Sequence, residues 1–248
     1  SLIGYPPKDL LFNPQLYEEE KDALNKLSER VSNLSQNLSI LIGIAEPTPD
    51  IEVPKLYNSV VILEKGAWRI VARKQLLPTY DVFDEKRYFR SAEKSSVLNF
   101  NYQEKLWKIG ITICEDIWVE QNLQKEKILG KDPIRSLEKE KLDLLINLSA
   151  SPFIESKSLL RQRIAAKAAI RLSCPVVYVN QVGGNDELIF DGSSFALNKK
   201  GKLQHELPAF KESVGLFDIS SLKQQPSISS KYPISQEVLF RALVLGVK

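Results

Sequence analysis

Apolar residues recur at helical spacing near the start of the chain and then gather into short runs. Between Asn13 and Asn37 the leucines and a valine fall at mixed intervals of three and four, with Glu and Lys at the other positions, which predicts an amphipathic helix. Residues 38–45 form an apolar run, and residues 59–63 and 68–72 flank a Glu-Lys-Gly-Ala turn. These three segments are predicted to be strands, the last two forming a hairpin.

The second half of the chain alternates apolar strands with helical patterns. Strands are predicted at 97–100, 107–113, 143–148 and 175–180, with a further hairpin around the turn at 198–201. Helices are predicted over 120–141, 155–172 and from 236 onward, the first of them exposed. This alternation indicates an α/β fold in which helices cover mixed sheets.

Composition and charge exclude several classes of protein. Apolar residues make up 43% and charged residues 26% of the 248 residues, as in ordinary soluble globular proteins. The net charge of +3 is too weak to attract nucleic acid or an anionic membrane, so neither is expected as a partner. No apolar run reaches about 18 residues and no signal-type segment opens the chain, which predicts a cytoplasmic protein. Met is absent throughout, so we expect the sequence to be cut from a longer protein.

Few residues are available for catalysis. Two cysteines and one histidine exclude a disulfide scaffold and a zinc ribbon, and no metal site is expected. Cys114 follows an apolar strand and precedes two carboxylates, at a corner where a nucleophile can face a pocket. The alternative is that Cys114 is a buried structural cysteine. Cys174 is expected to be a structural cysteine of that kind. A cysteine nucleophile needs a cation. Lys74 ends a strand, opens a loop rich in aromatic residues and could stabilise an oxyanion, or could be a solvated surface lysine. The charged run 84–87 is expected to be an exposed turn, and His205 is expected at the surface.

Five sequence blocks stand out along the chain: 4–11 (GYPPKDLL), 73–89 (RKQLLPTYDVFDEKRYF), 113–118 (ICEDIW), 147–152 (NLSASP) and 179–188 (VNQVGGNDEL). In this order they resemble the nitrilase superfamily and more closely the glutaminase domains of glutamine-dependent NAD+ synthetases. The resemblance runs from residue 4 to about residue 217 and implies an α-β-β-α sandwich of two mixed sheets covered by helices, here truncated at its N-terminus.

The resemblance also implies roles for individual residues. Cys114 matches the family's nucleophile and Lys74 its catalytic lysine, while the positions that match its glutamine-binding residues are Tyr80, Ser151 and Lys157. The triad Glu of the family stands upstream of the first block, so we expect it to be missing here and the fragment to be weak or inactive. Glu85 matches a secondary carboxylate of related enzymes and is not expected to replace that base.

The same resemblance implies a domain organisation and partners. Residues 1–223 are expected to form a glutaminase domain without its first strand and helix, and residues 224–248 a linker and the start of a helix that leads to an absent synthetase domain. The expected partners are L-glutamine, that synthetase domain and further copies of the chain. No cofactor is expected in this domain; ATP and Mg belong to the absent one. A free-standing amidase and an inactive binding module are the alternatives.

Overall fold

The computed structural model describes residues 2–48, 54–80, 82–119, 130–219, 222, 227–233 and 235–247. The chain folds as two compact units, one made of Ser1–Ser96 with Ile128–Lys131 and the other of Val97–Lys127 with Asp132–Lys248. Among the helices in these ranges, none is both long enough and apolar enough to cross a membrane.

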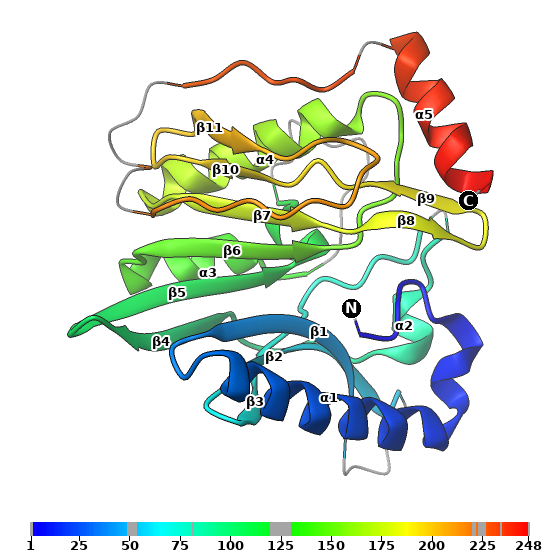
Figure 1. Ribbon diagram of the computed structural model, residues 1–248, viewed down its shortest axis with the longest axis vertical. Helices are drawn as coiled ribbons and strands as arrows, with labels where there is room; N and C mark the ends of the chain where they lie inside the picture. Colours follow the sequence, from blue (N-terminus) through cyan, green and yellow to red (C-terminus); the bar gives the residue numbers. More distant parts are fainter. Residues whose placement is uncertain are drawn as a thin grey trace. The chain divides into compact units, whose positions relative to one another are not determined.

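The first unit is built on three antiparallel strands with one long helix packed against them, as the apolar pattern predicts (Figure 1). The helix begins after Asn13, whose side chain accepts a hydrogen bond from the N–H of Gln15 at 3.1 Å. The strand order is β1-β2-β3. The elements are η1 (Lys8–Phe12), α1 (Pro14–Leu34), β1 (Ser39–Pro47), β2 (Leu56–Glu64), β3 (Ala67–Arg73) and α2 (Glu85–Tyr88).

The predicted hairpin and the apolar face of α1 form the core of this unit. Lys65 and Gly66 have φ of 52° and 80° between β2 and β3, the left-handed conformation that a tight hairpin turn needs. Leu24 of α1 is buried with Val61 and Leu63 of β2. The local pattern therefore predicts these elements correctly, because both the turn and the helix face are set by residues close together in the chain.

Glu20 is a buried carboxylate on the face of α1 that meets β1. Its two oxygens accept the N–H of Ala45 at 3.2 and 3.4 Å. Burial raises the pKa of Glu20 from 4.5 to about 7. The folded state therefore favours the neutral carboxylic acid, which is the opposite of what a surface glutamate does.

Glu20→Gln is expected to remove a pH dependence of stability. With a folded pKa above the unfolded one, the contribution of Glu20 is complete below pH 4.5 and is lost as the pH rises through 7. The native chain should lose about 2 kcal/mol of unfolding free energy from this group between pH 5 and pH 8, while the variant keeps an oxygen acceptor for Ala45 and loses none of it. Urea denaturation of both proteins at the two pH values measures the difference. An equal change in unfolding free energy between pH 5 and pH 8 in the native chain and in the variant would contradict the role of Glu20.

The second unit contains a six-stranded mixed sheet in the order β11-β10-β7-β6-β5-β4 and a separate two-stranded sheet, β8-β9 (Figure 1). Strands β5, β6 and β7 run parallel, and β10 is antiparallel to both of its neighbours. The strands are β4 (Ser96–Tyr102), β5 (Lys105–Ile113), β6 (Leu144–Ser149), β7 (Val176–Asn180), β8 (Val182–Asn185), β9 (Leu188–Asp191), β10 (Phe195–Leu197) and β11 (Leu203–Glu206). The helical elements are η2 (Cys114–Ile117), α3 (Pro133–Leu137), η3 (Glu138–Glu140), α4 (Lys157–Leu172) and α5 (Ser235–Val247).

The exposed helix expected over 120–141 is found only in part among the described residues, where the helical segments are short and the first of them is partly buried. Residues 120–129 lie outside the described residues. From 133 onward a five-residue helix starts at Pro133, where Asp132 caps the N–H of Arg135 at 2.9 Å, and Ile134 and Leu137 are buried. The Asp-Pro pair marks this helix start, so a local signal for the shorter element was present.

The end of the chain is attached to the second unit. Residues 227–233 have no regular structure, and α5 contacts β8 and β9. Val238 and Ala242 are the buried residues of α5, whereas Phe240 and Leu243 are exposed. The helix expected from residue 236 is present, and the domain boundary at 223 stays a prediction.

Candidate active site

Cys114 lies in a strained corner at the end of β5. Its φ is 46°, a left-handed conformation that costs a residue other than glycine about 1–3 kcal/mol. Two side chains hold the corner: Asp116 accepts the N–H of Ile113 at 3.1 Å, and the amide of Asn147 on β6 donates to the carbonyl of Cys114 at 3.3 Å. Residues in such conformations gather at functional sites, which supports the nucleophile interpretation of Cys114.

The two cysteines differ in accessibility. Cys114 is half-buried, while Cys174 is buried in the main core cluster. Burial raises the pKa of the Cys174 thiol to about 12, so this thiol stays protonated and unreactive. The prediction that Cys174 is structural is confirmed.

Lys157, at the first position of α4, is a cation that interacts electrostatically with Cys114. Its ammonium is 5.7 Å from the centre of the Trp118 ring. Burial lowers its pKa, with a further lowering by Arg161, while Cys114 and Glu115 act in the opposite direction. A negative charge on Cys114 and a positive charge on Lys157 therefore stabilise each other.

Ser151 is buried in the loop after β6. Its N–H donates to Oδ1 of Asn180 at 2.9 Å, and its hydroxyl oxygen accepts from Nε of Arg161 at 3.1 Å. The hydroxyl hydrogen can still donate to another group. The loop is therefore held in one place by side chains of β7 and α4.

Arg161 and Asp191 form a buried ion pair that the sequence analysis did not single out. Nη1 of Arg161 lies 2.7 Å from Oδ1 of Asp191, and the two side chains are 2% and 1% exposed. Nη2 of Arg161 also donates to the carbonyls of Ser151 and Pro152 at 2.9 and 3.0 Å. A signal existed: Arg161 falls in the buried stripe of α4, between Ser158 and Ile164, where a charge needs a partner.

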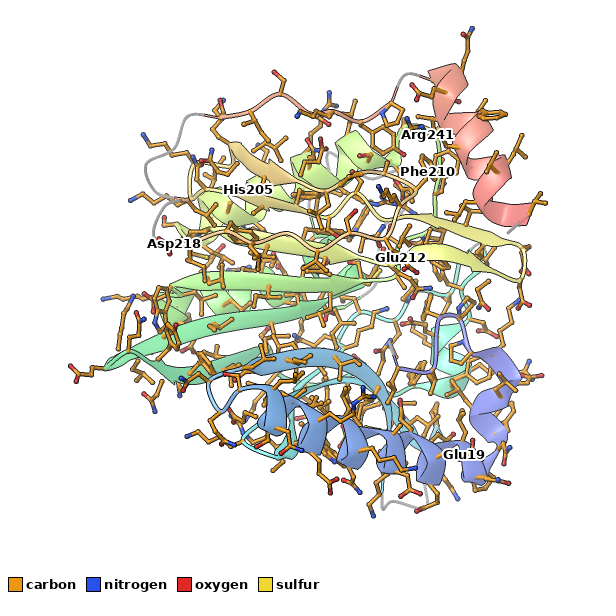
Figure 2. All side chains as sticks on the ribbon, viewed as in Figure 1. Glu19, His205, Phe210, Glu212, Asp218 and Arg241 are labelled. Atoms are coloured by element: carbon orange, nitrogen blue, oxygen red, sulfur yellow. The ribbon has the colours of Figure 1, made fainter. Side chains whose placement is uncertain are left out.

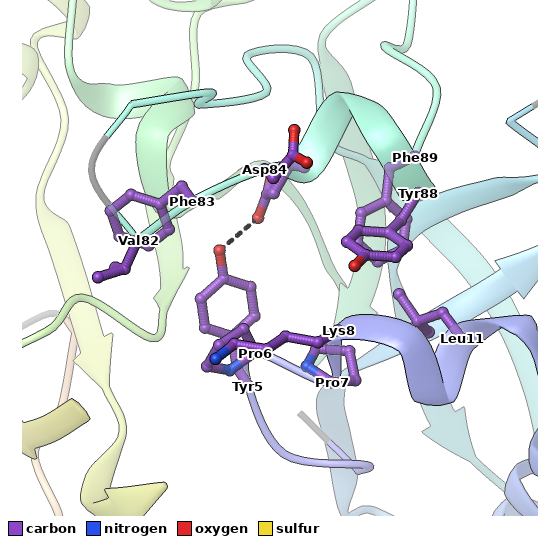
Figure 3. Close-up of a pocket in the computed structure, with 11 residues that line it drawn as sticks. Tyr5, Pro6, Pro7, Lys8, Leu11, Val82, Phe83, Asp84, Tyr88 and Phe89 are labelled. Carbon is purple, nitrogen blue, oxygen red and sulfur yellow. Dashed lines mark hydrogen bonds between the residues drawn. The ribbon is translucent and has the colours of Figure 1, made fainter. Parts of the chain in front are cut away.

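In the first unit, Lys74 is buried rather than solvated. Its ammonium lies 2.6 Å from Oε2 of Glu85, with the side chains 1% and 4% exposed, and the Tyr5 hydroxyl donates to Oε1 of Glu85 at 2.7 Å (dashed in Figure 3). The alternative of Lys74 as a surface cation is therefore wrong. The expectation that Glu85 belongs to an exposed charged turn is also wrong, because its side chain is buried and paired with Lys74. The pairing was not visible in the local pattern, since Lys74 lies eleven positions away in the sequence.

Aromatic side chains line a pocket that Glu85 also reaches. Tyr5, Phe83, Tyr88 and Phe89 line it together with Glu85 (Figure 3). Tyr80, half-buried, places its ring edge-on to Phe83 with 5.7 Å between ring centres. The loop that is rich in aromatic residues thus contributes to the pocket beside Glu85.

The predicted site residues fall into both units. Lys74 and Tyr80 belong to the first, and Cys114, Ser151 and Lys157 to the second. Their roles in catalysis and binding stay predictions.

His205 takes no part in either group. It is half-buried on β11 rather than at the open surface (labelled in Figure 2). Its ring stacks on Phe217 with 5.1 Å between ring centres.

Comparisons with known proteins identify relatives over the whole chain. A protein from Synechocystis named glutamine-dependent NAD(+) synthetase is 42% identical over 253 residues, which cover 100% of this chain and 44% of the relative. A second protein of that name, from Aquifex aeolicus, is 32% identical and is covered over 34% of its length. The chain thus spans less than half of the length of these relatives.

Solved structures show the same fold. The glutamine-dependent NAD+ synthetase from Acinetobacter baumannii matches with a TM-score of 0.79 and 32% identity, over 98% of this chain and 42% of that one. The amidase of the nitrilase superfamily from Nesterenkonia matches with a TM-score of 0.61 over 83% of this chain and 69% of that one. At 17% identity, this second match speaks for the fold alone and confirms the predicted α/β nitrilase-type fold. The model of the carbon-nitrogen hydrolase family matches residues 2–225, a range that includes the Cys114 corner and the Lys74–Glu85 pair, and the chain belongs to that family.

Proposed function

We propose that this chain is the glutaminase part of a glutamine-dependent NAD+ synthetase. The thiolate of Cys114 attacks the side-chain carboxamide carbon of L-glutamine, the C–N bond breaks, and ammonia leaves with a proton from a general acid. Water then cleaves the thioester, which releases glutamate and restores the thiol. In the whole protein, an ATP- and Mg-dependent synthetase domain uses the ammonia to amidate deamido-NAD+.

One observation carries the proposal: the φ of 46° at Cys114, in a corner held by Asp116 and Asn147. Other described residues also have a positive φ, but at Cys114 it coincides with a half-buried thiol at a strand end, where the charge of Lys157 favours the thiolate. The Synechocystis relative, 42% identical over the whole chain, is named glutamine-dependent NAD(+) synthetase. This name supports glutamine, rather than a simple amide, as the substrate.

The remaining residues take roles that their chemistry allows. We assign to Lys74 the stabilisation of the oxyanion that forms on the amide oxygen. Tyr80 and the Ser151 hydroxyl bind the amino-acid end of glutamine, and Lys157 pairs with its α-carboxylate. Recognition of these charged groups would reject amides that lack them.

A chloromethyl ketone analogue of glutamine tests the proposal. The thiolate displaces chloride from the carbon next to the ketone, so a C–S bond forms without any general acid. We expect alkylation of Cys114, detected by mass spectrometry, to proceed about 100-fold faster than with chloroacetone, because the amino-acid end is bound first. Free glutamine should protect Cys114.

Two controls belong to this experiment. Cys174, buried in the same chain, should stay unlabelled, and Cys114→Ala should take up no analogue. Equal rates with chloroacetone and the glutamine analogue would instead support a free-standing amidase. A rate no higher than that of free cysteine would support an inactive binding module.

A further inference from the structure

Residues 227–233, which we term the strap, lie along β11 and lead toward α5. The N–H of Ile228 donates to the carbonyl of Leu203 at 3.0 Å, and the N–H of Lys231 donates to Oε2 of Glu206 at 2.6 Å. Both contacts attach the strap to the last strand in the order of the six-stranded sheet. The strap is therefore bound to the second unit although it has no regular secondary structure.

Tyr232 connects the strap to the buried ion pair. Its hydroxyl donates to Oδ2 of Asp191 at 2.8 Å, while Oδ1 of the same carboxylate is bound by Arg161 at 2.7 Å. Burial and the neighbouring Asp191 raise the pKa of the Tyr232 hydroxyl, so it remains a donor. With both oxygens bound, the carboxylate of Asp191 is fixed in one orientation.

Arg161 carries the connection onward to the loop of Ser151. It contacts the hydroxyl oxygen and the carbonyl of Ser151 and the carbonyl of Pro152, at 2.9 to 3.1 Å. Three hydrogen-bonded steps thus lead from the strap to the loop, through Asp191 and Arg161.

We propose that Tyr232 is a positioning residue for the glutamine site and that the strap thereby sets the affinity for glutamine. The inference rests on the proposed function, in which Ser151 binds the amino-acid end. When Tyr232 leaves Asp191, the carboxylate can rotate, Arg161 follows it, and Ser151 loses its fixed position. Coupling between two sites is reciprocal, so bound glutamine holds the strap in place.

Tyr232→Phe removes only the hydroxyl and keeps the ring, whose centre is 6.4 Å from that of Phe210 (Figure 2). For the chloromethyl ketone analogue we expect the half-saturating concentration to rise about fivefold, the effect of losing one net hydrogen bond, with an unchanged maximal rate. Alkylation of Cys114 by iodoacetamide, which needs no amino-acid binding, should not change. Tyr102→Phe, at an exposed tyrosine of the same unit, is the matched control and should behave as the native chain.

Hydrogen exchange tests the coupling without any reaction. The N–H of Ser151, bound to Asn180, should exchange faster in Tyr232→Phe than in the native chain and in Tyr102→Phe. In Cys114→Ala, which cannot react, saturating glutamine should slow exchange at the N–H groups of Lys231 and Tyr232.

The outcomes separate the two proposals. An unchanged half-saturating concentration in Tyr232→Phe overturns the positioning role, and so does an equal loss of rate with iodoacetamide, since that indicates general disruption. If the native chain is not labelled by the analogue, the proposed function fails, and the exchange rate at Ser151 alone decides whether Tyr232 fixes that loop.

Discussion

Arg161→Met is expected to lower the free energy of unfolding by about 3–5 kcal/mol, the usual cost of removing one partner from a buried ion pair. Methionine leaves the carboxylate of Asp191 buried without the guanidinium that neutralises it, and with a neutral donor, the Tyr232 hydroxyl, still bound to Oδ2. It also removes the donors that bind the carbonyls of Ser151 and Pro152. Urea denaturation at pH 7, followed by circular dichroism, measures the loss.

The chain offers a matched surface pair as the control for this variant. Arg241 and Glu237 form an ion pair one helical turn apart on α5, with both side chains 46% exposed (Arg241 is labelled in Figure 2). Arg241→Met makes the same chemical change in solvent and should alter stability by no more than about 0.5 kcal/mol. Similar losses in the two variants would mean that burial of the Arg161–Asp191 pair does not determine its effect.

Lys74→Met is expected to lower stability by about 3–5 kcal/mol as well and to remove the rapid labelling of Cys114. The variant leaves the buried carboxylate of Glu85 without its ammonium partner at 2.6 Å. In the proposed mechanism, Lys74 also polarises the carbonyl oxygen, that of the amide in glutamine and that of the ketone in the analogue, and displacement of chloride by the thiolate is slower when the adjacent ketone is not polarised.

A double variant separates these two effects. Lys74→Met combined with Glu85→Gln removes both charges. The amide oxygen of the new side chain at position 85 can still accept a hydrogen bond from the Tyr5 hydroxyl. Most of the stability should return, because no uncompensated buried charge remains, while labelling by the chloromethyl ketone stays slow. Full recovery of labelling in the double variant would show that Lys74 has only a structural role.

The fold is more predictable from the sequence than the site. Helix α1 and the β2–β3 hairpin follow from spacing and turn residues within a few positions of each other, and the structure contains both. The corner at Cys114 was predictable for the same reason, since the apolar strand before it and the carboxylates after it mark the end of a strand. Its left-handed backbone and its hydrogen bond with Asn147 of the neighbouring strand were not.

The partners of buried charges could not be identified from local patterns. The position of Arg161 in the buried stripe of α4 signals that its charge needs a partner, but Asp191 lies thirty positions away and no local pattern identifies it as that partner. Glu85 was assigned to an exposed turn, because a short Asp-Glu-Lys-Arg run has that default interpretation and its buried lysine belongs to another strand end. Long-range pairing of charges is decided by the tertiary fold, which the apolar period does not encode.

At position 114, backbone stability and thiol chemistry favour different residues. Glycine adopts a φ of 46° at no steric cost, so at this position the substitution that would relax the chain is also the one that would end its thiol chemistry. Variation screened for thermal tolerance alone would drift toward the inert residue, and only selection for turnover would keep the sulfur.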